Sequence, residues 1–233
     1  MAVACTAPSL FAARPPAGTY RPLARPAAAR RVAIKPRAAA ETVSAAASTV
    51  PPSVSPAVLP GTPAPGDAFP FTADQLVALA QKVHFETENG VKDPAVLADD
   101  FRFEFPIIKF DRATYLKTVS GFTFKEGIPN LNSNAYGFQA DKFEPNRVWF
   151  FVRTSGTHTG PFKFGNDTYE ATGKTIQGPP ELCSYTFNKE GKVTSFTGGY
   201  VVDNRVGNTK GLGAAFGILS AIGINIPTPG SLG

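Results

Sequence analysis

From residue 122 onward the chain is composed mainly of segments with the composition of β-strands. Aromatic and β-branched residues dominate four of these segments, which cover residues 134–140, 147–157, 181–188 and 192–202. Turn-forming residues separate them, as in Glu144-Pro145-Asn146 and Asn188-Lys189-Glu190-Gly191. This arrangement predicts a long antiparallel meander in the second half of the chain.

Three helical segments are predicted before the meander. Thr72 and Gln75 have the spacing of a capping box, and the apolar residues after them recur at helical intervals as Leu76, Leu79, Ala80 and Val83. Asn89-Gly90 provides a stop signal for this helix. Asp93-Pro94 predicts a short second helix through Leu97, and a third is expected from Asp111 to Gly121.

A strictly alternating segment lies between the second and third helices. Phe101, Phe103 and Phe105 alternate with Arg102 and Glu104, a pattern typical of a half-buried strand. Helices followed by a meander predict an α+β fold, in which three N-terminal helices pack on one face of a strongly curved antiparallel sheet.

The first forty residues have the composition of an organelle-targeting peptide. They contain no Asp or Glu, fourteen Ala, six Arg and one Lys. We therefore interpret residues 1–40 as a plastid transit peptide that directs the protein to the chloroplast stroma, with a mitochondrial address as the alternative. Residues 41–70, rich in Pro, Ala, Ser and Thr, are expected to form a disordered linker.

The positive net charge belongs to the targeting segment. The whole chain has 23 basic and 18 acidic residues, but without the seven basic residues of positions 1–40 only 16 basic residues face the 18 acidic ones. No basic stripe remains, so nucleic-acid binding is not expected. Cys183 is the one cysteine beyond residue 40, and His84 and His158 are the two histidines, so neither a disulfide nor a metal site is predicted.

The end of the chain is glycine-rich and apolar. After the domain predicted at 71–205, residues 206–233 form a tail whose apolar part, 211–226, is shorter than the roughly 20 residues that a spanning helix needs. A transmembrane span is not expected. We interpret the apolar part as a C-terminal helix that docks on the domain or on a partner.

Three short elements within 71–205 resemble those of a known family. They are Gly156-Thr157-His158-Thr159-Gly160, Thr172-Gly173-Lys174, and Gly191-Lys192-Val193 opening the strand that ends with Val201-Val202-Asp203. In order and spacing the chain resembles the SnoaL-like polyketide cyclases of the nuclear transport factor 2-like superfamily. The resemblance implies a cone-shaped α+β barrel with a pocket for a small hydrophobic molecule and no cofactor.

The same resemblance suggests where catalysis would take place. Asp203 matches the general acid/base of aldol ring closure in the cyclases, and His158 is the second catalytic candidate. In a related group, the ketosteroid isomerases, two carboxyls do the chemistry. Here Phe105 and Cys183 occupy or adjoin those positions, so that isomerase apparatus is not expected.

Further side chains are candidates for contacting a ligand. They combine aromatic area with a polar group or lie on the predicted aromatic interior, and they are Trp149, Arg153, Tyr136, Tyr185, Tyr200, Phe103 and His84. Three functions remain open: cofactor-free acid/base catalysis of the cyclase or isomerase type on an enolisable metabolite, non-catalytic binding of a hydrophobic metabolite, and an interaction module. A homodimer through the sheet or the C-terminal tail is a further expectation.

Overall fold

The computed structural model describes residues 57–60, 62–64, 67–164 and 166–224, which all belong to the unit Val54–Gly233. The predicted transit peptide at 1–40 and most of the predicted linker at 41–70 lie outside these residues. The elements follow in the order α1 (Ala73–Phe85), η1 (Pro94–Val96), β1 (Leu97–Phe105), β2 (Ile108–Asp111), α2 (Arg112–Ser120), α3 (Phe124–Gly127), β3 (Tyr136–Ala140), β4 (Arg147–Val152), β5 (Ser155–Thr157), β6 (Phe162–Phe164), β7 (Asp167–Tyr169), β8 (Thr175–Gln177), β9 (Glu181–Phe187), β10 (Val193–Val201) and α4 (Ala214–Ala221).

The helix signals read from the sequence lie where the structure begins its helices. The Thr72 side chain accepts from the Gln75 N–H, and the Gln75 side chain accepts from the Thr72 N–H, so the capping box is present at α1. Asp111 caps α2, which ends at Ser120 before Gly121. The second predicted helix is only a single 3₁₀ turn, because the chain after Val96 continues directly into β1.

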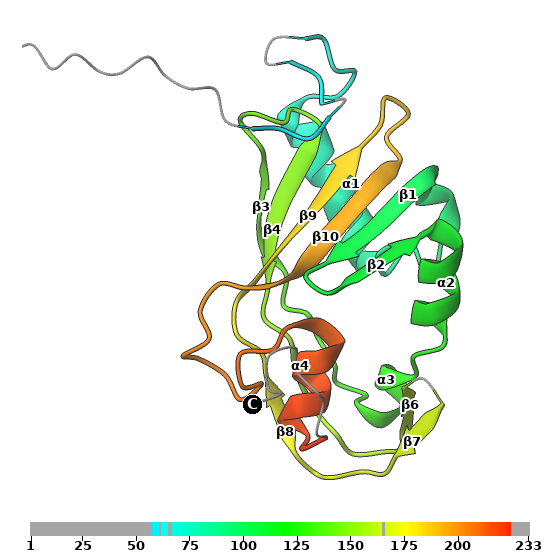
Figure 1. Ribbon diagram of the computed structural model, residues 1–233, viewed down its shortest axis with the longest axis vertical. Helices are drawn as coiled ribbons and strands as arrows, with labels where there is room; N and C mark the ends of the chain where they lie inside the picture. Colours follow the sequence, from blue (N-terminus) through cyan, green and yellow to red (C-terminus); the bar gives the residue numbers. More distant parts are fainter. Residues whose placement is uncertain (1–56, 61, 65–66, 165, 225–233) are drawn as a thin grey trace, which may run out of the picture. The chain divides into compact units, whose positions relative to one another are not determined.

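Six strands form one sheet, in the order β2-β1-β10-β9-β4-β3 (Figure 1). All neighbouring strands are antiparallel except β1 and β10, which pair in parallel. The expectation of a purely antiparallel sheet is therefore wrong. A local strand pattern predicts which face of a strand is buried but not its partner, and β1 pairs with a strand from the far end of the meander.

The main core lies between one face of this sheet and helices α1 and α2. Inward-facing residues alternate along the strands, for example Val148 and Phe150 on β4 and Cys183, Tyr185 and Phe187 on β9, and all of them are buried. Side chains from α1, including Leu76 and Ala80, close this core from the other side.

A second, smaller core lies beyond the end of the sheet. The strand pairs β5–β8 and β6–β7 belong to this part of the molecule. Figure 1 shows β6, β7 and β8 there together with α3 and α4. The buried residues of this core are Ile128, Phe162, Ile176, Ile218, Leu219 and Ile222. Residues Ala214–Ala221 of the predicted tail thus form a helix, α4, that packs on the domain itself. No helix among the described residues has the length and apolar character that a membrane crossing requires.

Candidate functional site

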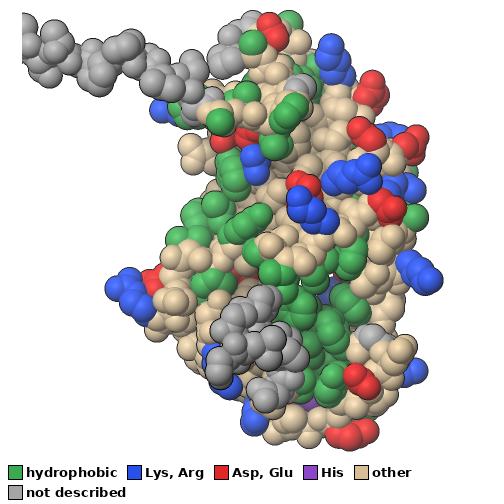
Figure 2. All heavy atoms as spheres, in the orientation of Figure 1, with side chains coloured by type: hydrophobic (Ala, Val, Ile, Leu, Met, Phe, Trp, Pro, Cys, Tyr) green, Lys and Arg blue, Asp and Glu red, His purple; other side chains and the backbone are tan. Residues whose placement is uncertain are grey.

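A largely apolar cavity of about 700 Å³ lies at the end of the sheet, between the β1–β2 hairpin, α2 and the residues that lead into α4. Figure 2 shows hydrophobic side chains gathered in the hollow beside α4. The lining residues are Phe103, Phe105, Pro106, Ile107, Ile108, Phe110, Thr118, Val119, Phe122, Phe164, Gly199, Tyr200, Val201, Gly211, Leu212, Gly213, Ala214, Ala215 and Phe216. None of them is Asp, Glu, His, Lys, Arg or Cys, so the described lining offers hydrophobic contact and few polar groups.

Stacked aromatic rings from the β1–β2 hairpin form one side of the cavity. The ring of Phe103 stacks on Phe105 at a centroid distance of 4.1 Å and on Phe110 at 5.8 Å. Gly199 on β10 has a φ of +72°, and a Cβ there would lie 2.7 Å from the Phe105 ring. Glycine at this bulge therefore lets the Phe105 ring lie directly on the strand backbone.

The segment of residues 210–214, which we call the wall, contributes Gly211, Leu212, Gly213 and Ala214 to the lining. Lys210, Gly211 and Ala214 have φ angles of 56°, 76° and 50°, so two non-glycine residues of the wall adopt the left-handed conformation. Gly213 lies close against the sheet, since a Cβ there would be 2.8 Å from the Gly199 carbonyl oxygen and 2.7 Å from Oε2 of Glu181. The wall is thus a strained segment pressed onto β9 and β10.

A buried carboxyl holds the wall. Glu181, the first residue of β9, is 3% exposed, and its Oε2 accepts a hydrogen bond of 2.8 Å from the Ala214 N–H at the start of α4. Burial raises the pKa of Glu181 to about 7, and the Ala214 hydrogen bond acts in the opposite direction. Glu181 forms no ion pair with any described residue.

Glu181 is the functional candidate that the sequence prediction missed. It lies two residues before Cys183 on the same strand, so the two side chains share the inner face of β9. Burial, and next the charge of Glu181, raise the pKa of the Cys183 thiol to about 12. The sequence does contain a signal for this residue. Glu181 precedes Cys183, Tyr185 and Phe187 at the two-residue spacing of one strand face, and that face is otherwise apolar or aromatic.

Neither residue of the predicted catalytic pair, Asp203 and His158, lines the cavity. Asp203 forms a two-pronged pair with Arg205, with its Oδ1 2.9 Å from Nε and its Oδ2 2.8 Å from Nη2. These hydrogen bonds lower the pKa of Asp203, which makes it a weaker base. Asp203 does not line the cavity, so the geometry that a general acid/base needs is missing.

His158 is a buried residue of the second core. Its Nδ1 lies 3.0 Å from Thr172 Oγ1 and accepts from the Thr172 N–H at 3.3 Å, while its ring packs edge-on against Phe162. The ring therefore links the loop before β8 to the end of β5. Like Asp203, it is absent from the cavity lining.

His84 and Tyr185, both expected to contact ligand, lie together in the main core. The Tyr185 hydroxyl donates to Asn89 Oδ1 and lies 3.4 Å from His84 Nδ1, and His84 Nε2 lies 2.8 Å from Ser133 Oγ. Burial lowers the pKa of His84 to about 4, so the ring is neutral at physiological pH. This network satisfies polar groups in a filled interior, and neither residue lines the cavity.

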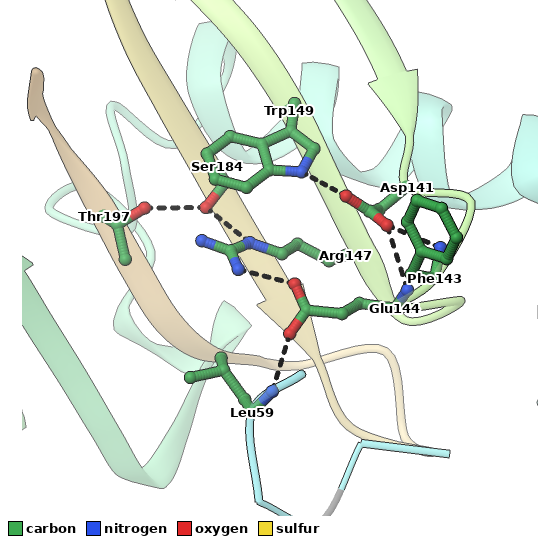
Figure 3. A network of polar contacts seen from close by, with 8 residues as sticks. All are labelled: Leu59, Asp141, Phe143, Glu144, Arg147, Trp149, Ser184 and Thr197. Atoms are coloured by element: carbon green, nitrogen blue, oxygen red, sulfur yellow. Dashed lines mark hydrogen bonds and ion pairs between the residues drawn. The ribbon is translucent and has the colours of Figure 1, made fainter. Parts of the chain in front are cut away.

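Trp149 belongs to a polar network on the other face of the sheet (Figure 3). Its Nε1 donates to Asp141 Oδ2 at 2.6 Å, and the Arg147 guanidinium lies 3.9 Å from its ring centroid. Arg147 also pairs with the buried Glu144 and donates to Ser184 Oγ, which lies 2.7 Å from Thr197 Oγ1. Trp149 does not line the cavity.

Tyr136 and Arg153 are exposed and also lie outside the cavity lining, with the Tyr136 ring stacked on Phe151. The homodimer expected through the sheet or the C-terminal tail stays a prediction. Of the side chains proposed from the sequence, Phe103 and Tyr200 do line the cavity. Phe103 is buried in the aromatic side, whereas Tyr200 is 45% exposed.

No family model matches the chain, and no match was found among curated proteins. Solved structures do resemble it. A putative hydroxylase, AclR, from Streptomyces galilaeus has 17% identity and a TM-score of 0.45, with 65% of this chain and 98% of that chain covered. A putative SnoaL-like polyketide cyclase from Jannaschia sp. CCS1 has 18% identity and a TM-score of 0.40, with 57% of this chain and 88% of the cyclase covered. An NTF2-like protein from Burkholderia thailandensis has 12% identity and a TM-score of 0.38, with 53% of this chain and 88% of that protein covered. Of these three structural neighbours, one is described as SnoaL-like and one as NTF2-like.

Proposed function

We propose that this protein binds an uncharged hydrophobic small molecule in the cavity between the β1–β2 hairpin, α2 and the wall. The observation that carries the proposal is the lining itself, which combines about 700 Å³ of space with aromatic and aliphatic side chains. Pockets of this size and character accommodate small organic ligands. A charged ligand would lose its hydration without gaining a partner, because no charged side chain is part of the described lining.

Filling the cavity from α2 tests this proposal. Val119→Trp places an indole where Val119 lines the cavity, and we expect the affinity for Nile red, a neutral hydrophobic dye, to fall by at least about tenfold, or roughly 1.4 kcal/mol. Ala113→Trp is the matched control, because Ala113 is an exposed residue of the same helix and does not line the cavity. Equal binding by the wild type and both variants in a fluorescence titration would show that the dye binds elsewhere.

Acid/base catalysis is the second candidate function, and one observation favours it. A carboxyl whose pKa is about 7 is well suited to exchange protons at neutral pH, and Glu181 contacts two residues that line the cavity. Binding remains the better supported function, since the carboxyl itself is not part of the lining. For any hydrophobic metabolite that the protein converts, Glu181 rather than Asp203 is the residue to replace.

The proposed location is the chloroplast stroma, with the mitochondrion as the alternative. The acid-free composition of residues 1–40 supports removal of this segment. We expect the mature protein to begin between about Arg37 and Asp67, and amino-terminal sequencing of the native protein measures this directly. A native protein that retains Met1 would contradict the proposal.

A further inference from the structure

Two side chains of the described cavity lining carry a polar group. They are Thr118 on α2 and Tyr200 on β10, and every other described lining residue is apolar or glycine. Tyr200 is 45% exposed, so water solvates much of its side chain. Thr118 is half-buried. Its hydroxyl is therefore the polar side-chain group that the less exposed part of the lining offers to a ligand.

The hydroxyl of Thr118 has no hydrogen-bond partner among the residues that the structure describes. Ser and Thr hydroxyls in helices commonly bond to a backbone carbonyl of the preceding turn. On the same helix, the Ser120 hydroxyl donates to the Lys117 carbonyl. At the end of α1, the Thr87 hydroxyl donates to the Val83 carbonyl at 2.8 Å. Thr118 makes no such bond, so its hydroxyl is available to a bound molecule.

The apolar character of the rest of the lining gives this hydroxyl its importance. Beyond the end of α2, Phe122 also lines the cavity, and its ring stacks on Phe164 at a centroid distance of 4.7 Å. A ligand that fills the cavity displaces the water that solvates the Thr118 hydroxyl. An oxygen-free ligand leaves the hydroxyl without a partner, which costs free energy, whereas a ligand oxygen at this position replaces the lost bond.

We propose that the ligand of the cavity carries an uncharged hydrogen-bonding oxygen on an otherwise apolar body, and that the Thr118 hydroxyl binds this oxygen. The inference rests on the proposed binding function and adds the chemical class of the ligand, a hydrophobic carbonyl compound or alcohol rather than a hydrocarbon. The threonine hydroxyl donates to a carbonyl oxygen, and it both donates to and accepts from an alcohol. A small number of placed polar groups is what orients a ligand in an apolar pocket.

Two probes of nearly the same shape test the role of Thr118. Acetylnaphthalene has a carbonyl oxygen where isopropenylnaphthalene, substituted at the same ring position, has a methylene group. Their affinities are measured by displacement of Nile red, whose own affinity is first determined for each variant. Thr118→Val removes the hydroxyl at nearly constant volume, and we expect it to weaken binding of the acetyl probe roughly three- to tenfold more than binding of the isopropenyl probe. Thr118→Ser keeps a hydroxyl and should keep the ratio of the two affinities close to the wild-type value.

Thr114→Val is the matched control on the same helix. Thr114 lies one turn before Thr118, is exposed and does not line the cavity, so the same chemical change should leave the ratio of affinities unchanged. The capping bond that Asp111 accepts comes from the Thr114 backbone N–H, which valine retains. A spectroscopic signature accompanies the affinities. The carbonyl stretch of the bound acetyl probe, measured by isotope-edited infrared spectroscopy, should lie at lower frequency in the wild type than in Thr118→Val.

The outcomes separate this inference from the binding function on which it rests. If Thr118→Val changed the affinities of both probes by the same factor, Thr118 would not bind the ligand oxygen. Val119→Trp should weaken both probes, and in that case the binding function stands whatever the result at Thr118. If Val119→Trp weakened neither probe, the binding function would be wrong, and the role of Thr118 with it.

Discussion

Replacing Glu181 with Gln is expected to remove a pH-dependent loss of stability. Below about pH 4.5 the carboxyl is protonated in both the folded and the unfolded chain, and its burial costs no ionisation energy. As the pH rises toward about 7, the unfolded chain ionises first, so the free energy of unfolding of the wild type falls. The glutamine is neutral at every pH and escapes this loss.

The expected size of the effect follows from the same pKa values. Between pH 5 and pH 8 the stability of Glu181→Gln relative to the wild type should rise by up to about 2.5 kcal/mol. Denaturant unfolding of both proteins at the two pH values measures the difference, in which any constant effect of the amide group cancels.

For Asp203→Asn, the difference in stability from the wild type should depend on pH in the opposite direction. Hydrogen bonds from Arg205 lower the pKa of Asp203, so its contribution to stability is present at neutral pH and is lost as the pH falls through the folded-state pKa. The free energy of unfolding of this variant should therefore be lower than that of the wild type at neutral pH and approach it in acid.

For Glu181→Gln, a difference in the free energy of unfolding from the wild type that does not change between pH 5 and pH 8 would contradict the prediction. It would mean that Glu181 is hydrated in the folded protein.

Phe103→Ala is expected to lower the free energy of unfolding by about 3–5 kcal/mol, the usual cost of removing a buried aromatic ring. The Phe103 ring lies 4.1 Å from Phe105, 5.0 Å from Tyr115 and 5.5 Å from Phe196, measured between centroids. Its loss removes packing from the main core and widens the cavity on its aromatic side. Chemical denaturation gives the value.

Ile107→Ala is the control for this second prediction. Ile107 lies in the turn between β1 and β2 and is 58% exposed, so its truncation should change the stability by less than about 0.5 kcal/mol. If the two variants lost the same stability, Phe103 would not have the central position in the aromatic cluster that the ring contacts indicate.

Local signals in the sequence predicted local structure well. Thr72 with Gln75 and Asp111 mark the starts of the two main helices, because a capping side chain bonds to a backbone N–H only a few residues away. Phe101, Phe103 and Phe105 alternate along β1 as expected. The α+β class follows from such signals. The parallel pairing of β1 with β10 does not, because the same alternation is compatible with either direction.

The candidate site was predicted only in part, for a similar reason. An aromatic interior was expected, and Phe103 and Tyr200 do line the cavity. The wall depends on where the chain after β10 returns, and no periodic pattern encodes the contact between Ala214 and Glu181, which are 33 residues apart. Asp203 was chosen from a family position, whereas its orientation is decided by the neighbouring Arg205.

The location of a bound hydrophobic probe tests the central claim most directly. Methyl-labelled protein titrated with Nile red should show intermolecular nuclear Overhauser effects from the methyl groups of Ile108, Val119 and Leu212, which line the cavity. The methyl groups of Leu76 in the main core and Ile222 in the second core should show none. Contacts confined to the cavity methyl groups are the predicted result. Saturable binding with contacts only to methyl groups outside the cavity would contradict the account.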